Sequence, residues 1–116
     1  MTDLILNYKT TRPDLRVYVE EMMDGCPDSN LKKFYDRSPV HFIKNIIGRL
    51  LIVHGVSDPN VHIEHVTLAK EVLDANKVEY EELLFNDEGH GIHKAKNRRV
   101  LFRKIAVFFR EGVILI

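Results

Sequence analysis

The sequence has little cysteine and no excess of positive or negative charge. Cys26 is the single cysteine among 116 residues, and 17 Lys and Arg balance 17 Asp and Glu. One cysteine can form neither an intrachain disulfide nor a Cys-rich zinc site, and low cysteine use is typical of a reducing compartment. Without a basic excess, binding to nucleic acid or to an anionic membrane is not expected. We therefore expect a cytoplasmic protein that binds neither.

The sequence also lacks long apolar runs, repeats and linkers rich in Gly, Ser and Pro. No run approaches the roughly 20 apolar residues that span a bilayer, and the first residues do not resemble a signal peptide. A chain of this length can bury about two thirds of its unfolded surface, which is enough for one core. We expect residues 1–116 to form a single unit.

The second half of the chain shows the clearest pattern. The apolar run LLIV, bounded by Gly48 and Gly55, predicts a buried strand over residues 49–54. Apolar residues then recur every three or four positions over 62–77, which predicts an amphipathic helix, and 79–85 predicts a second strand. Strand, helix and strand form a βαβ unit with parallel strands and a right-handed crossover, so the predicted fold class is α/β.

Flanking helices are predicted over residues 15–23, 31–35 and 94–110. Ser38 followed by Pro39 is typical of a helix cap with Pro at the first helical position. The last helix is expected to bury one apolar stripe, made of Leu101, Ile105, Phe108 and Phe109. The tail 113–116 is unusually apolar and is expected to pack down or to form an interface.

Chemistry-bearing residues follow both predicted strands. Residues 54–61 read HGVSDPNV and residues 86–91 read NDEGHG. Open α/β sheets place ligand groups beyond the carboxyl ends of their strands, and neighbouring strands lie only about 4.8 Å apart. Asp58 and His90 should therefore meet. A carboxylate that accepts a proton from one imidazole nitrogen leaves the other nitrogen free as a general base.

The remaining histidines predict no metal or cofactor. His62 and His65 lie three residues apart on the predicted helix but have no third ligand at fitting spacing, so we expect them on a solvated helix face. His54 is expected to be packed and hydrogen-bonded at its strand end.

Together these motifs resemble the α/β-hydrolases of the prolyl oligopeptidase and acylaminoacyl-peptidase family. The resemblance rests on Ser38-Pro39, on LLIVHG with Asp58 and Val61, on DEGHG, and on Lys94 with Asn97-Arg98. It implies that the chain is the C-terminal portion of an α/β-hydrolase domain and has a partial α/β-hydrolase fold, that Asp58 is the triad acid, and that His90 is the triad base. The implied substrates are peptides or esters.

The family's nucleophile motif, G-x-S-x-G, is missing from the sequence. Ser29, Ser38 and Ser57 lie outside any strand-to-helix elbow, and Pro27 after Cys26 removes an N–H that an oxyanion hole would need. We expect the nucleophile-bearing N-terminal portion to be absent, so that the chain is a fragment or relic that is inactive alone. Two alternatives stay open: an interaction module that oligomerises through an exposed sheet edge, and a half-enzyme completed by another chain.

Overall fold

A parallel pair of strands forms the centre of the computed structural model, which describes residues 1–112. Strand β1, Leu50–Gly55, pairs with strand β2, Tyr80–Phe85, and the register runs from Leu50 beside Tyr80 to Gly55 beside Phe85. Helix α4, Glu64–Ala75, connects them. The predicted βαβ unit with parallel strands is therefore confirmed, and the helix is two residues shorter at each end than its apolar pattern indicates.

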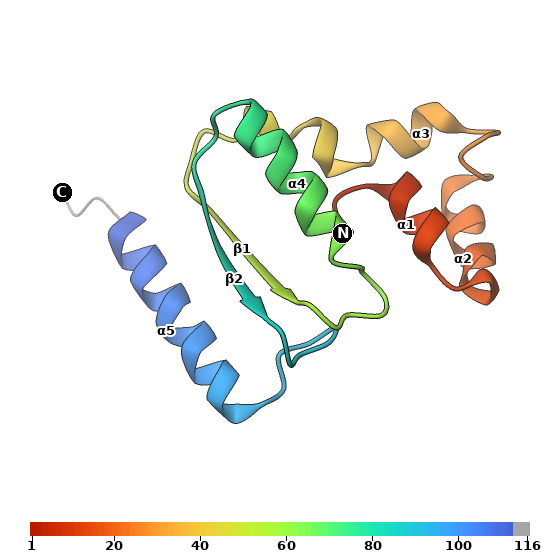
Figure 1. The fold of residues 1–116 in the computed structure, drawn as a ribbon. Helices are drawn as coiled ribbons and strands as arrows, with labels where there is room; N and C mark the ends of the chain where they lie inside the picture. The colour runs from red at the N-terminus through yellow and green to blue at the C-terminus, as the bar shows by residue number, and fades with distance from the viewer. Residues whose placement is uncertain (113–116) are drawn as a thin grey trace.

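Two helices enclose this sheet. Helix α5, Ala95–Gly112, lies on the side opposite α4 (Figure 1). Helix α4 buries Val66, Ala69 and Leu73. The stripe expected to be core on α5 is only half-buried, and Phe109 is 64% exposed, which corrects that prediction. The reason is that the sheet is narrow. Neighbouring strands lie about 4.8 Å apart, so the two described strands cover only part of the apolar face of α5.

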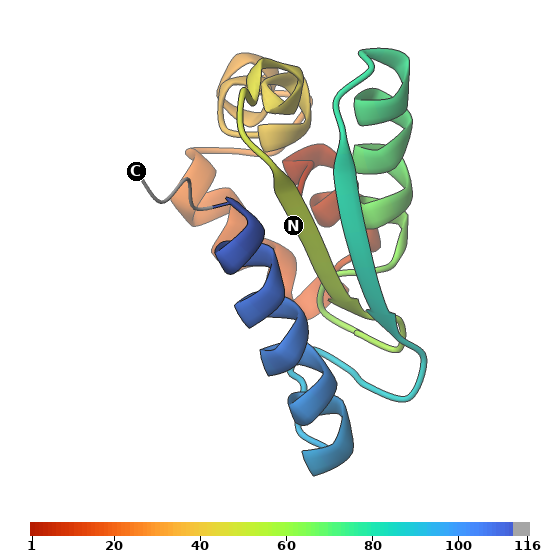
Figure 2. The same cartoon turned by 90° about the vertical axis from the view of Figure 1, so that its left-hand side faces the viewer.

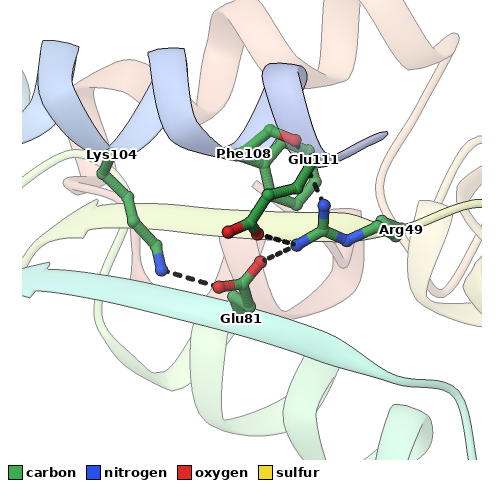
Figure 3. Close-up of polar contacts among 5 residues, drawn as sticks. All are labelled: Arg49, Glu81, Lys104, Phe108 and Glu111. Carbon is green, nitrogen blue, oxygen red and sulfur yellow. Dashed lines mark hydrogen bonds and ion pairs between the residues drawn. The ribbon is translucent and has the colours of Figure 1, made fainter. Parts of the chain in front are cut away.

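A polar cluster fixes the C-terminal half of α5 to the sheet (Figure 3). The Arg49 guanidinium, just before β1, pairs with Glu81 of β2 at 2.7 Å and with Glu111 of α5 at 3.3 Å. It also donates to the Phe108 carbonyl at 3.2 Å and lies 4.6 Å from the centre of the Phe108 ring. Lys104 of α5 pairs with the other oxygen of Glu81 at 2.6 Å. One arginine therefore joins both strands to α5.

The N-terminal third forms a helical layer on the α4 side of the sheet (Figures 1 and 2). Its elements are α1, Leu4–Thr10; α2, Pro13–Met23; α3, Leu31–Asp36; and two 3-10 turns, η1, Pro39–His41, and η2, Ile43–Asn45. Val19, Met23 and Phe34 form its core. The sequence did not predict α1, whose start is capped by Asp3 through the N–H groups of Ile5 and Leu6.

Ser38 occupies the predicted cap position, with Pro39 as the first residue of η1, but its hydroxyl has another role. It precedes η1, but its hydroxyl makes no cap bond there. The hydroxyl instead donates to the Phe34 carbonyl at 2.6 Å and accepts the N–H of Leu4 at 2.9 Å. Ser38 therefore joins the end of α3 to the start of α1. The apolar tail 113–116 lies outside the described residues, so its predicted packing stays a prediction. None of the helices within residues 1–112 is long and apolar enough to span a membrane.

Candidate functional site

The carboxyl ends of the two strands bring Asp58 and His90 together. The parallel register ends with Gly55 beside Phe85, so the loops that follow emerge at the same edge of the sheet. His90 Nδ1 lies 2.9 Å from Asp58 Oδ2, across 32 residues of sequence. An ionised carboxylate can only accept hydrogen bonds, so Nδ1 carries the proton and the neutral ring leaves Nε2 as an acceptor.

Asp58 is held by the backbone of its own loop. Its Oδ1 accepts the N–H of Asn60 at 2.8 Å and of Val61 at 2.9 Å, and only 5% of its side chain is exposed. Burial alone would raise the pKa of Asp58, but the hydrogen bonds from Val61, His90 and Asn60 outweigh it and hold the pKa below its ordinary value. The carboxylate is therefore ionised at neutral pH and fixed in orientation.

His90 differs sharply from its partner in exposure, since 63% of its side chain is open to solvent. The pair thus combines a buried anion with an imidazole that an external molecule can reach. That combination suits general base catalysis, because the carboxylate stabilises the imidazolium that forms when the ring takes a proton.

The two loops are also joined through their backbones. The N–H of Ser57 donates to the Glu88 carbonyl at 3.0 Å, and the N–H of Val56 donates to the Phe85 carbonyl at 2.9 Å. Gly55 lies so close to the second loop that only a glycine fits there. The separation of Asp58 and His90 is therefore set by a rigid junction and not by their side chains alone.

The other histidines lie away from this pair. His65 is 1% exposed, which corrects its predicted place on a solvated face; its Nδ1 lies 3.3 Å from the backbone nitrogen of Thr2 and it packs under the N-terminus. His62 lies beside Glu64. His54 is half-buried, and within residues 1–112 its Nε2 has no hydrogen-bond partner, unlike the bonded histidine that was expected.

The serine and cysteine side chains are engaged elsewhere. Ser29 bonds to Cys26, Ser38 joins α1 to α3, and the Ser57 hydroxyl donates to the Asn86 carbonyl at 3.2 Å. Within the described part of the chain, none of them forms a hydrogen bond to His90. No group of three or more potential metal ligands gathers in this part either.

Comparison with known proteins places this chain in a family. The profile of the prolyl oligopeptidase family matches residues 1–113. The chain belongs to the prolyl oligopeptidase family. This serine peptidase family was the one that the motifs around Asp58 and His90 resemble, so that prediction is confirmed.

Curated relatives agree with this assignment. The chain is 29% identical over 101 residues to the uncharacterized peptidase YtmA of Bacillus subtilis, a match that covers 87% of this chain and 39% of that protein. It is 30% identical over 99 residues to dipeptidyl aminopeptidase A of Saccharomyces cerevisiae, covering 83% of this chain and 10% of that protein. The chain therefore spans well under half the length of these relatives.

Solved structures of peptidases share the fold. The dipeptidyl peptidase 4 of Porphyromonas gingivalis matches with a TM-score of 0.79 and 28% identity over 84% of this chain and 14% of that chain. A puromycin-hydrolyzing peptidase of Mycobacterium tuberculosis matches with a TM-score of 0.84 and 22% identity over 99% of this chain and 18% of that chain. The predicted partial α/β-hydrolase fold is thus confirmed.

Proposed function

We propose that this chain supplies the acid and the base of a serine peptidase triad, Asp58 and His90, and that it acts on peptide or ester bonds once a nucleophile is supplied. The observation that supports the proposal is the 2.9 Å contact between a buried Asp58 carboxylate and an exposed His90 ring. The arrangement matches the roles of these two groups in acyl transfer.

The chemistry assigns one task to each group. A serine hydroxyl outside these 116 residues attacks the substrate carbonyl while His90 Nε2 takes its proton. His90 then returns that proton to the leaving amine or alcohol, and water repeats the cycle on the acyl-enzyme. Asp58 holds the ring in the tautomer that leaves Nε2 free, and it stabilises the imidazolium. The chain by itself is then a fragment of such an enzyme, or a relic of one, without activity.

A chimera tests this proposal. The matching 101 residues of the Bacillus subtilis peptidase are replaced by this chain, so that the rest of that protein supplies the remaining parts of the domain. We expect the chimera to react with a fluorophosphonate probe and to hydrolyse fluorogenic peptide amides. His90→Ala should lower kcat by at least about 10³-fold, in the range that removal of a triad member costs. His93→Ala, three residues along the same loop, is the matched control and should retain activity.

Two outcomes would count against the proposal. Hydrolysis by the chimera that survives His90→Ala would mean that this histidine is not the base. Labelling of the isolated chain by the fluorophosphonate would mean that it holds a nucleophile of its own, contrary to the expected inactivity.

An interaction module remains a second candidate, supported by the unpaired edge of β1. In the described residues the sheet has two strands, so β1 pairs only with β2 and leaves its other edge open. Such an edge can pair with a second copy of the chain or with a chain that completes the enzyme. Light scattering of the isolated chain would show a concentration-dependent dimer if self-pairing occurs, and a monomer at high concentration would exclude it.

A further inference from the structure

The loop that carries His90 is held from one side by a single buried carboxylate. Glu88 is 4% exposed, and its two oxygens accept three hydrogen bonds. Oε2 accepts the N–H of His93 at 3.1 Å, while Oε1 accepts the N–H of Lys94 at 2.8 Å and the side-chain amide of Asn97 at 2.9 Å. The bonds from His93 and Lys94 to the Glu88 side chain therefore close the loop of residues 89–92, which includes His90.

The other side of the same residue faces the acid loop. The Glu88 carbonyl accepts the N–H of Ser57, next to Asp58, at 3.0 Å. Glu88 thus joins three parts of the site: the loop of Asp58 through its backbone, and the loop of His90 and the start of α5 through its side chain. Among residues 1–112 the His90 ring has one hydrogen bond, to Asp58, and the ring is mostly exposed, so its position depends on how firmly this backbone is held.

Asn97 completes the arrangement from α5. It is 5% exposed, and its amide nitrogen donates both to Glu88 Oε1 and to Asp87 Oδ1, each at 2.9 Å. The hydrogen bond from Asn97 is the main cause that lowers the pKa of Glu88; burial opposes it, and the N–H groups of His93 and Lys94 add to it. The ionised carboxylate also lies at the positive end of the α5 helix dipole. Arg49 fixes the other half of α5 to the sheet (Figure 3), so the helix is a firm support.

We propose that Glu88 and Asn97 form a positioning pair that holds His90 Nδ1 against Asp58 by fastening the loop of His90 to the start of α5. The inference rests on the proposed function of Asp58 and His90 and adds two residues that act through them. Neither touches the reacting atoms. Without them, the glycines on both sides of His90 would leave the loop free to move the ring away from the carboxylate.

The test measures the Asp58 carboxyl directly by ¹³C NMR titration of the 116-residue chain. The His90 contact is one of the causes that lower the pKa of Asp58, so His90→Ala should raise that pKa and calibrate the loss of the contact. Glu88→Gln keeps the size of the side chain but replaces one acceptor by a donor that faces the N–H of His93. We expect Glu88→Gln and Asn97→Ala each to reproduce most of the rise seen in His90→Ala. The low-field proton signal of His90 Nδ1–H should broaden or vanish in both.

Lys94→Gln is the matched control. It removes the exposed ion pair between Lys94 Nζ and Asp87 at 2.9 Å, yet keeps the Lys94 N–H that donates to Glu88. The Asp58 titration should be unchanged in this variant. In the active chimera, Glu88→Gln should lower kcat far more than KM changes, because positioning affects the reacting geometry and not substrate binding.

Two results would overturn the inference. If Glu88→Gln lowers the melting temperature but leaves the Asp58 titration and the His90 signal as in the wild type, Glu88 only stabilises the start of α5, and the proposed function is untouched. If His90→Ala also leaves the Asp58 titration unchanged, the Asp58 contact itself is absent, and the proposed function fails with the inference.

Discussion

Gly55 and Gly89 approach each other so closely that a Cβ atom on Gly55 would lie 2.1 Å from the Gly89 carbonyl oxygen. Gly55 ends β1 and Gly89 directly precedes His90, so this contact joins the strand that leads to the acid to the loop that holds the base. The missing side chain of Gly55 thereby allows the loops of Asp58 and His90 to come this close.

Gly55→Ala should therefore push the two loops apart. Its Cβ would also meet the Glu88 carbonyl oxygen at 2.7 Å, and neither contact can be relieved by rotating a side chain. Overpacking of this kind costs about 1–3 kcal/mol of unfolding free energy, measurable by urea denaturation. Gly48→Ala is the matched control, since nothing lies within 4 Å of its Cβ position, and it should change stability by no more than about 0.5 kcal/mol. Equal losses in the two variants would contradict the close contact.

Asp58→Asn should change the tautomer of His90 without unfolding the loop. The amide oxygen of the new side chain can still accept the N–H groups that Oδ1 accepts now, while its NH₂ group faces His90 and can only donate. Nδ1 must then lose its proton, and Nε2 gains it. Long-range ¹H–¹⁵N NMR distinguishes the two tautomers. In the active chimera the same variant should lower kcat by roughly 10⁴-fold, as a wrong tautomer does in serine peptidases. A wild-type tautomer in Asp58→Asn would show that the carboxylate does not set the state of the ring.

His65 should make stability fall as the pH drops below neutrality. Burial, aided by the positive N-terminus, lowers its pKa in the folded chain, whereas the unfolded chain takes up the proton near pH 6.5. The unfolded state then binds more protons, so unfolding free energy is lost as pH falls through 6.5, at up to about 1.4 kcal/mol per pH unit for one proton. His65→Asn should flatten the profile between about pH 7 and 5. Urea titrations at each pH measure this slope, and parallel profiles for the wild type and His65→Asn would refute the assignment.

Arg49→Met should loosen the C-terminal half of α5. The variant keeps an apolar side chain near Phe108 but loses the pairs with Glu81 and Glu111 and the bond to the Phe108 carbonyl. Hydrogen exchange of the amides of residues 105–111 should speed up several-fold, in keeping with a loss of about 1 kcal/mol for a partly exposed cluster. Lys70→Met removes the Lys70 to Glu82 pair, which has no partner on α5, and should leave those amides unchanged. Protection that stays at the wild-type level in Arg49→Met would show that the Arg49 contacts do not hold this half of α5.

Local patterns were sufficient to predict the βαβ unit. A continuous apolar run predicted the first strand, residues 79–85 were read as the second, and three-four spacing predicted the helix between them, because such patterns reflect which side of an element is buried. The pair Asp58 and His90 followed from the same reasoning, since parallel strands end at one edge. The start of α1 was missed, although Asp3 has the residue type of a cap, because the residues after it show no clear apolar period.

What the sequence determined by itself is the type of each element, the family, and the edge at which Asp58 and His90 meet. Tertiary structure decided the rest. Glu88 and Asn97 stand nine residues apart in motifs with no period, and only the packing of α5 against the loop brings the carboxylate to the amide. Helical spacing could not predict the burial of His65 or the exposure of Phe109 either. Spacing shows which residues share a face, but the neighbours that cover that face come from distant parts of the chain.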